Sequence, residues 1–221
     1  MARSLDVVVL GASGHGMVVC DILLSGGEDT RVIGFADADP SKRGTQVLGL
    51  TVIGAIDDLR GRDDLHVAMG IGDNAARRRE FVRLAALGLR PVTVVHPSAV
   101  VSARAAIGRG TVIMANVTIN VAAEIGDNVI LNTASSIDHH CVVGAHSHIA
   151  PGATLAGNVR IADETLVGAG AVILPGISIG AHCTVAAGAV VTGNVPDGVT
   201  VAGVPARVIS SSASVPRNVR V

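Results

Sequence analysis

Two patterns of hydrophobic positions divide the chain near residue 95. Before that point, short apolar runs alternate with stretches in which apolar residues recur at helical spacing. After the dipeptide His96-Pro97 the helical spacing disappears, and an aliphatic residue recurs every six positions. We therefore expect a first domain over residues 1–95, a second over 96–209 and a tail over 210–221.

The first pattern predicts a small α/β domain. Three apolar runs have the length and composition of strands: LDVVVLG (5–11), RVIGFADAD (31–39) and LHVAMGIG (65–72). A helical stretch begins near His15 after the first run, and another, NAARRREFVRLAALG (74–88), follows the third. Strands that alternate with helices at this spacing indicate a short parallel sheet flanked by helices, a Rossmann-like arrangement.

The second pattern predicts a parallel β-helix. From Val101 to Val191, sixteen consecutive positions spaced by six residues all carry Val, Ile or Leu. The residue four positions after each of them, from Ala105 to Val195, is small or β-branched. Such repeats predict one short strand and one turn per hexad, with three hexads closing a coil of eighteen residues. Stacked coils then hydrogen-bond at a spacing of about 4.8 Å.

Composition narrows the functions that the chain can have. Hydrophobic residues make up 49% of it, but Trp and Tyr are absent and Phe occurs only twice, so Val, Ile, Leu and Ala must build the core. The formal net charge of −1 argues against nucleic acid or an anionic membrane surface as a partner. The three cysteines lack CxxC spacing, and neither a signal peptide nor a membrane-spanning run is apparent. We therefore expect a reduced, cytoplasmic protein.

Four of the eight histidines lie within ten positions, between His139 and His148. The repeat places His139 and His140 at a corner of the coil, with their side chains pointing outward. One coil later, Gly157 should lie directly against His139, leaving room beside the imidazole and a backbone N–H close by. A base next to such a donor suits attack on a thioester carbonyl. Asp138 and His140 flank His139, and either could orient its ring.

Two other interpretations of these histidines remain. The first is that polar residues at turns only keep the surface soluble, because the repeat by itself also fits a passive solenoid. The second is a metal site. Hexapeptide-repeat carbonic anhydrases bind zinc through three histidines, two of which are separated by four residues, and that spacing is absent here. We therefore favour a base and expect no metal.

A glycine-rich segment separates the first predicted strand from the first predicted helix. Gly11, Gly14 and Gly16 let the backbone approach an anion, and the helix N-terminus offers N–H groups, so phosphate or pyrophosphate is the expected ligand. Asp37 ends the second strand, where an acid meets a ribose hydroxyl or a base. The pattern also fits an NAD dehydrogenase, although the region is short for a complete dinucleotide fold and the chain lacks Tyr. The glycines could also serve only a tight turn.

Several segments together resemble one family over nearly the whole chain. They are the hexads and the sequences GASGHG (11–16), FADAD (35–39), GIGDN (70–74), HPSAVV (96–101) and VAGVPARV (201–208). They resemble the bacterial nucleotide-sugar N-acetyltransferases that include the bacillosamine and perosamine pathway enzymes; the sialic-acid O-acetyltransferases are similar. The resemblance implies a left-handed β-helix of hexapeptide repeats, a homotrimer, and acetyl-CoA bound in the groove between subunits.

The resemblance also implies roles for individual residues. His139 matches the catalytic base. Because this chain has His140 where relatives often carry an acid, the orienting role would pass to Asp138. The nucleotide-linked sugar would contact Gly11, Ser13, Gly14, His15 and Asp37, together with Asn116 of a neighbouring subunit. Acetyl-CoA would contact His148, Gly157, Gly203, Pro205, Ala206 and Arg207.

These matches predict an acetyl-CoA-dependent N-acetyltransferase. Its acceptor would be the 4-amino group of a 4-amino-4,6-dideoxysugar linked to UDP or GDP, and its pathway the synthesis of bacterial surface glycans. His139 would take a proton from the amine, which then attacks the thioester. A sialic-acid type O-acetyltransferase and a non-catalytic solenoid remain the alternatives.

Overall fold

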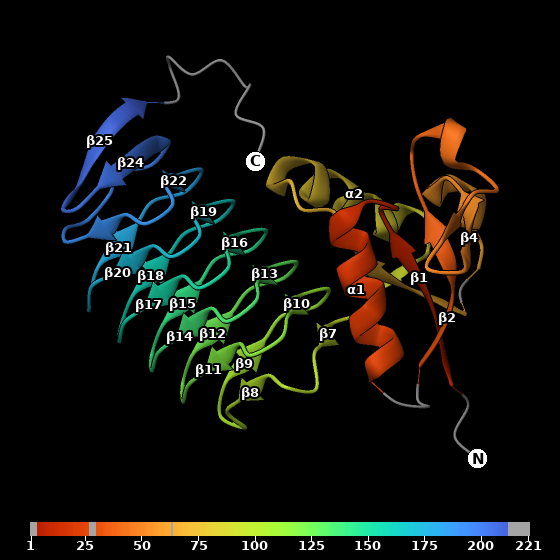
Figure 1. Ribbon diagram of the computed structural model, residues 1–221, viewed down its shortest axis with the longest axis horizontal. Coiled ribbons are helices and arrows are strands. Elements are labelled where there is room, and N and C mark those ends of the chain that lie inside the picture. The colour runs from red at the N-terminus through yellow and green to blue at the C-terminus, as the bar shows by residue number, and fades with distance from the viewer. Residues whose placement is uncertain (1–3, 27–29, 63, 212–221) are drawn as a thin grey trace.

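The computed structural model describes residues 4–26, 30–62 and 64–211. A six-stranded sheet with two helices is followed by a column of stacked coils, and helix α1 lies between the sheet and the first coils (Figure 1). Residues 212–221 of the predicted tail lie outside the described part, whereas residues 210 and 211 belong to the last strand.

The first part is the α/β domain that the strand–helix alternation predicts. Its sheet has the strand order β3-β4-β2-β1-β5-β6, and its neighbouring strands are parallel except for β3 and β4. Its strands are β1 (Leu5–Leu10), β2 (Thr30–Ala36), β3 (Gln46–Val47), β4 (Leu50–Gly54), β5 (Leu65–Met69) and β6 (Arg90–Pro91). Its helices are α1 (Gly14–Ser25) and α2 (Asn74–Ala86), with 3-10 turns at Pro40–Lys42 and Ile56–Leu59.

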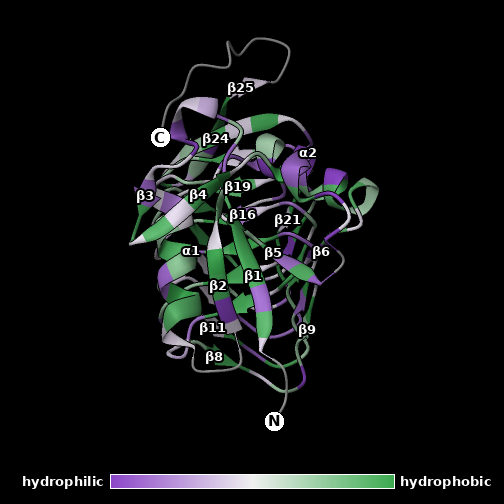
Figure 2. Cartoon of the chain, turned by 90° about the vertical axis from the view of Figure 1, so that its right-hand side faces the viewer, coloured by the Kyte–Doolittle hydropathy of each residue, from purple (hydrophilic) through white to green (hydrophobic). Residues whose placement is uncertain are grey.

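The sheet buries different apolar side chains on its two faces. Val7 and Val9 of β1 belong to a core that includes residues of α1 and continues into the interior of the coils. Val8 and Leu10 belong to a second core with Leu84 of α2. Figure 2 shows β1 and β4 largely in the colour of apolar residues. Because successive side chains of a strand point to opposite faces, one apolar run contributes to both cores.

The second part is a parallel β-helix made of two-residue strands. Paired strands of neighbouring coils are eighteen residues apart, as in the pairs Ile113–Leu131 and Leu131–Ile149. This register confirms the coil of three hexads. Strand β7 (Val94–Val95) already pairs with β10 (Val112–Ile113), so the column begins two residues before the predicted boundary at 96.

The coils stack into three sheets, which form the three faces of the column. The docking face, next to the first domain, contains β7, β10, β13 (Ile130–Leu131), β16 (His148–Ile149), β19 (Leu166–Val167), β22 (Thr184–Val185), β24 (Val199–Gly203) and β25 (Ala206–Ser211). The small-residue face contains β8 (Val100–Val101), β11 (Thr118–Ile119), β14 (Ser136–Ile137), β17 (Thr154–Leu155), β20 (Val172–Ile173) and β23 (Val190–Val191). The third face contains β9 (Ala106–Ile107), β12 (Glu124–Ile125), β15 (Val142–Val143), β18 (Arg160–Ile161) and β21 (Ser178–Ile179).

The predicted aliphatic ladder lines the interior of the column. From Ile113 to Val191, each of its residues is at most 4% exposed. Val101 and Ile107 are partly exposed, because they lie in the first coil and have no coil below them. The aliphatic side chains therefore form the continuous core that the six-residue period predicts.

Each corner of the column turns through residues in the left-handed backbone conformation. Asn and His tolerate this conformation better than most residues, and Gly does so freely. The Asn116 corner contains Asn116, Ala134, Gly152 and Gly170; the His139 corner, named for the preceding residue, contains Ala122, His140, Asn158 and Gly176; the α2 corner contains Asn128, His146, Glu164 and His182.

One buried arginine connects the two parts. Arg77 of α2 is fully buried, and its guanidinium donates hydrogen bonds to backbone oxygens on both sides. On the α2 corner it reaches the carbonyl groups of Asn128 (3.1 Å), His146 (2.7 Å) and Ser147 (3.2 Å). In its own domain it reaches the carbonyl group of Gly72 (3.0 Å). The guanidinium thus holds the loop before α2 against the coils.

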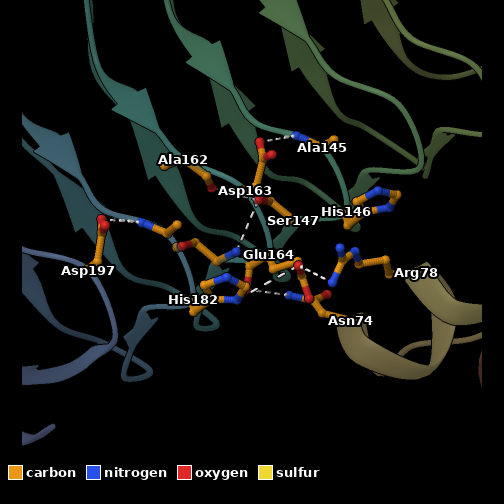
Figure 3. A network of polar contacts seen from close by, with 12 residues as sticks. Asn74, Arg78, Ala145, His146, Ser147, Ala162, Asp163, Glu164, His182 and Asp197 are labelled. Atoms are coloured by element: carbon orange, nitrogen blue, oxygen red, sulfur yellow. Dashed lines mark hydrogen bonds and ion pairs between the residues drawn. The ribbon is translucent and has the colours of Figure 1, made fainter. Parts of the chain in front are cut away.

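A second set of contacts joins the start of α2 to the α2 corner (Figure 3). Oε1 of Glu164 lies 3.0 Å from Nη1 of Arg78 and 3.8 Å from Nδ1 of His182. The carbonyl oxygen of Glu164 accepts a hydrogen bond of 3.4 Å from Nδ2 of Asn74. The side chain of Arg78 is 54% exposed, so water weakens this ion pair.

The two arginines should therefore differ in their contribution to stability. Arg77→Met leaves the carbonyl oxygens of Asn128 and His146 without their donor, and one such unpaired group costs about 1–3 kcal/mol. We expect the free energy of unfolding to fall by about 3 kcal/mol or more. The matched control, Arg78→Met, removes an exposed ion pair worth about 0–1 kcal/mol. Urea denaturation measures both, and equal losses would contradict the role of Arg77.

Candidate active site

His139 lies on an outward corner of the column, with its ring against the next coil. The residue is exposed, as the repeat predicts. A Cβ atom built on Gly157 would lie 2.6 Å from Nε2 and 2.6 Å from Cε1 of the His139 ring. Among the described residues, the N–H of Gly157 has no hydrogen-bond acceptor. The predicted arrangement, an imidazole against a glycine with a free amide, is therefore present.

The ring of His139 contacts His140, and Asp138 does not contact it. Nδ1 of His139 lies 3.1 Å from Nδ1 of His140, with the rings nearly perpendicular at 83°. Oδ1 of Asp138 accepts the backbone N–H of His139 (2.7 Å) and Nδ2 of Asn120 (2.9 Å). The hydrogen bond from the His139 amide, followed by that from Asn120, lowers the pKa of Asp138. Among the described contacts, the expected hydrogen bond between Asp138 and the ring is not made, and Oδ1 of Asp138 binds the backbone of His139 instead.

A second pair of histidines lies where the first domain meets the docking face. The ring centroids of His148 and His15 are 6.4 Å apart, and Nδ2 of Asn132 lies 3.1 Å from Nε2 of His148. Burial, followed by the charge of Arg77, lowers the pKa of His148 to about 3 and that of His15 to about 4. Both rings are therefore neutral near pH 7.

Sequence reasoning missed Asn132 and found His148. Asn132 directly follows Leu131, which pairs with Ile149 in the next coil. The eighteen-residue register alone therefore brings Asn132 close to His148, and this signal could have identified it.

Within one chain, His148 lies apart from His139 and Gly157. His148 projects from the docking face, whereas His139 lies at the corner between the small-residue face and the third face. Asn116 lies exposed at yet another corner, where its backbone N–H donates to Oγ of Ser98 (3.0 Å). One chain therefore presents two separate groups of candidate residues.

The glycine loop borders a pocket of about 340 Å³ at the carboxyl ends of the parallel strands. Among its lining residues are Gly11, Ser13, Asp37, Ile71, Gly72, Arg79, Glu80 and Arg83. A crevice at this edge of a parallel sheet is the usual ligand site of such domains. The lining brings together Gly11, Ser13 and Asp37 of the residues expected to contact the nucleotide-linked sugar, whereas Gly14 and His15 are not among its lining residues.

Asp37 at this pocket is already held by protein groups. Its Oδ2 accepts the N–H of Ala12 (2.8 Å) and Nζ of Lys42 (2.8 Å), and its Oδ1 accepts the N–H of Asp39 (3.0 Å). Burial raises the pKa of Asp37, but the hydrogen bonds from Lys42, Asp39 and Ala12 outweigh it and lower the pKa overall. Lys42, which the sequence did not single out, therefore adds a positive charge beside the loop.

The three glycines of the loop have different roles. Gly11 has a φ of +108°, and a Cβ there would lie 2.7 Å from the carbonyl oxygen of Gly70. A Cβ on Gly16 would collide with the carbonyl oxygen of Gly11. A Cβ on Gly14 would meet no atom within 4 Å. Close packing of the backbone thus explains why residues 11 and 16 are glycine. It does not explain Gly14, at the start of α1, where the open space lets a ligand approach.

The C-terminal motif forms a turn and one wall of a second pocket. Gly203 ends β24, and Pro205 lies in the turn between β24 and β25. Ala206 and Arg207 line a pocket of about 240 Å³ together with Val191, Thr192, Gly193, Asn194, Val195, Val201 and Val208. Gly193 continues the stack that begins with His139 and Gly157, because each coil adds eighteen residues. This pocket therefore extends from the His139 corner to β24 and β25 of the docking face. Its side at Gly193 lies three coils, or about 14 Å, along the column from His139.

The described residues contain no group of three or more His, Cys, Asp or Glu side chains placed to hold a metal ion. The helices in that part of the chain are too short or too polar to cross a membrane.

The neutral histidines predict a loss of stability on acidification. Both have a lower pKa in the folded state than in the unfolded chain, so the unfolded chain takes up protons first as the pH falls below about 6.5. Each such histidine then lowers the free energy of unfolding by at most about 1.4 kcal/mol per pH unit. We expect His148→Gln to reduce the dependence of the unfolding free energy on pH between 7 and 5, measured by urea denaturation. At pH 8 the same pair of proteins gives the baseline, and an unchanged pH dependence would contradict the prediction.

Family models match both parts of the chain. The PglD N-terminal domain matches residues 6–84, and the bacterial transferase hexapeptide family, of six repeats, matches residues 122–157 and 158–193. The boundary between these matches lies in the region where the sheet gives way to the coils.

Curated relatives are similar over part of their length. The chain is 38% identical over 149 residues to GDP-perosamine N-acetyltransferase from Escherichia coli O157:H7, across 65% of this chain and 67% of that protein. It is 38% identical over 113 residues to UDP-N-acetylbacillosamine N-acetyltransferase from Bacillus subtilis (strain 168), across 50% of this chain and 51% of that protein. The second match thus spans about half the length of the relative.

Solved structures are similar over nearly the whole chain. The acetyltransferase domain of PglB from Neisseria gonorrhoeae FA1090, in complex with acetyl coenzyme A, has a TM-score of 0.87 and 36% identity, covering 94% of this chain and 100% of that one. PerB from Caulobacter crescentus, in complex with CoA and GDP-perosamine, has a TM-score of 0.85 and 38% identity, covering 95% and 99%. The chain therefore belongs to the family of nucleotide-sugar N-acetyltransferases that join a PglD N-terminal domain to hexapeptide repeats.

Proposed function

We propose that the protein transfers acetyl from acetyl-CoA to the 4-amino group of a UDP- or GDP-linked 4-amino-4,6-dideoxysugar, in the synthesis of bacterial surface glycans. The observation that carries this proposal is the ring of His139 lying against Gly157, at an exposed corner that the core does not need. The named activities of the relatives, acetyl transfer to GDP-perosamine and to a UDP-linked bacillosamine sugar, support the same acceptor class.

Acetyl-CoA is proposed to lie along the His139 corner. The pocket beside Ala206 and Arg207 would receive the nucleotide end of the molecule, where the exposed Arg207 side chain is available to phosphate groups. About 14 Å separates this pocket from His139 along the stack of coils. A pantetheine arm can span that distance, so the thioester would reach His139 and Gly157.

The nucleotide-linked sugar is proposed to occupy the pocket at the glycine loop. Ser13 caps α1 without a side-chain hydrogen bond to the helix, which leaves the first N–H groups of α1 to a phosphate. The open space at Gly14 favours the same ligand. His15 and His148 would then lie on the path between this pocket and the docking face.

A homotrimer is proposed because one chain holds the two groups of residues apart. The outward residues of the small-residue face carry no charge: Val100, Thr118, Ser136, Thr154, Val172 and Val190. Packing along this face would bring the Asn116 corner of one subunit towards the His139 corner of the next. Asn116, His148 and the bound sugar of one subunit would then meet His139 of another.

The chemistry would divide between the two groups as follows. Nε2 of His139 accepts the proton that the amine loses as its nitrogen attacks the thioester carbon. The N–H of Gly157 donates to the oxygen that becomes negative. The C–S bond then breaks, and the thiolate takes up a proton to leave as CoA thiol. A cytoplasmic site for this reaction stays a prediction; the three cysteines are all free and buried in the structure.

A thiol-release assay tests the proposal. With acetyl-CoA, the protein should release thiol in the presence of a UDP- or GDP-linked 4-amino-4,6-dideoxysugar, and His139→Ala should lower kcat/KM about a hundredfold or more. His182→Ala, at an exposed corner away from His139, is the control, and its kcat/KM should stay close to that of the unaltered protein. Turnover only with sugar hydroxyl groups would indicate an O-acetyltransferase. Neither turnover nor CoA binding would indicate a passive solenoid.

Two glycine variants test the pocket at the glycine loop. Gly14→Ala adds a methyl group where the protein leaves open space, so the melting temperature should not change. KM for the nucleotide sugar should rise about tenfold, because the backbone can no longer approach the ligand. Gly16→Ala places its methyl group against the carbonyl oxygen of Gly11 and should lower the melting temperature. Thermal melts and steady-state kinetics check both. Similar kinetics for Gly14→Ala and the unaltered protein would count against the nucleotide site.

A further inference from the structure

We infer that His140 is a positioning residue that fixes His139 in the tautomer able to act as a base. The inference rests on the proposed acetyl transfer, in which Nε2 of His139 must carry a lone pair. Its basis is the distance of 3.1 Å between the two Nδ1 atoms. His139 donates its Nδ1–H across this contact, and His140 accepts it with an unprotonated Nδ1.

The contact between two ring nitrogens limits the protonation of the pair. At 3.1 Å, one hydrogen atom lies between the two Nδ1 atoms, so one ring donates and the other accepts. When His139 is the donor, its only remaining nitrogen is Nε2, which faces the space beside Gly157. If His139 were instead the acceptor, its Nε2 would carry the hydrogen and could not accept a proton from an amine.

The backbone of the corner holds His140 in place for this role. His140 has a φ of +57°, the left-handed conformation that turns the corner, and its N–H donates to the carbonyl oxygen of Val121 in the coil below (3.2 Å). Asp138 binds the backbone amide of His139 and Nδ2 of Asn120 through its Oδ1, and none of the described hydrogen bonds joins its carboxylate to the ring of His139. The only side chain that the described contacts place against Nδ1 of His139 is therefore His140.

An imidazole in this position has a different effect from a carboxylate. A carboxylate attracts the positive charge of a protonated His139, whereas a neutral imidazole does so only weakly. Protonating both rings would put two N–H donors face to face. Asp138 is the charged group of the same turn, and Arg104 carries a charge on this corner two coils below. The coils directly above and below present Gly157, Asn158 and Ala122, which carry no charge.

Variants at residue 140 separate this role from a structural one. His140→Ala removes the acceptor, and we expect kcat to fall about tenfold to a hundredfold while KM for both substrates stays within about twofold. His140→Asn supplies an amide oxygen as acceptor and tolerates the left-handed backbone, so it should recover about tenfold of the lost kcat. His182→Ala, with nearly the same φ of +54°, is the matched control for the backbone. An unchanged kcat in His140→Ala, or no recovery in His140→Asn, would overturn the inference.

Two further readouts do not depend on stability. In His140→Glu the acid limb of the pH–rate profile should move to higher pH, because a carboxylate favours protonated His139; an unmoved limb would overturn the inference. Long-range ¹H–¹⁵N spectra of ¹⁵N-histidine protein should show His139 protonated at Nδ1 and bare at Nε2 near neutral pH. Protonation at Nε2 would overturn the inference. The spectrum can be recorded without turnover, so it tests the tautomer independently of activity. If the unaltered protein transferred no acetyl, the proposed function would be disproved, and the tautomer of His139 could still be measured.

Discussion

The side chain of Arg77 is fully buried, and its guanidinium donates hydrogen bonds to carbonyl oxygens of both parts of the chain. A buried charge is tolerated only when its donors are satisfied, so this contact requires the loop at Gly72 and the α2 corner to keep one relative position. The same charge, after burial, helps to lower the pKa of His15 and His148. One interaction therefore fixes the geometry between the two parts and adds to the effect of burial on the histidines between them.

The docking of the first domain also decides which surfaces of the column remain available. Arg77 and Glu164 attach α2 to one corner, and the adjoining docking face is covered. The His139 corner and the small-residue face stay open along the column. A reaction at His139 with a substrate carried by the first domain therefore calls for a second copy of the chain, which is the physical reason for the proposed assembly.

The contacts that follow from the length of one coil could be predicted from the sequence. The hydrogen-bond partner of a side chain with several possible neighbours could not. An eighteen-residue period puts Gly157 next to His139 before any coordinates are known, and the structure confirms that contact. The same period could have predicted that Asn132 lies near His148, because Leu131 pairs with Ile149 in the next coil. It could not show that Asp138 would bind a backbone amide and leave the ring to His140. The role of Arg77 was equally hidden, because nothing in a run of three arginines says which one is buried.

The environments of the histidines distinguish their possible roles in acetyl transfer. A group that takes a proton from an amine near pH 7 needs a pKa that is not far below that pH. His148, with a pKa of about 3, holds a proton too weakly to serve as this base, and His15, at about 4, is little better. Both remain neutral rings that can donate or accept a hydrogen bond to a substrate. The burial that makes them reliable hydrogen-bonding groups also excludes them as proton acceptors. The proposed mechanism therefore assigns proton removal to the exposed corner, where His139 lies against a free amide and another imidazole.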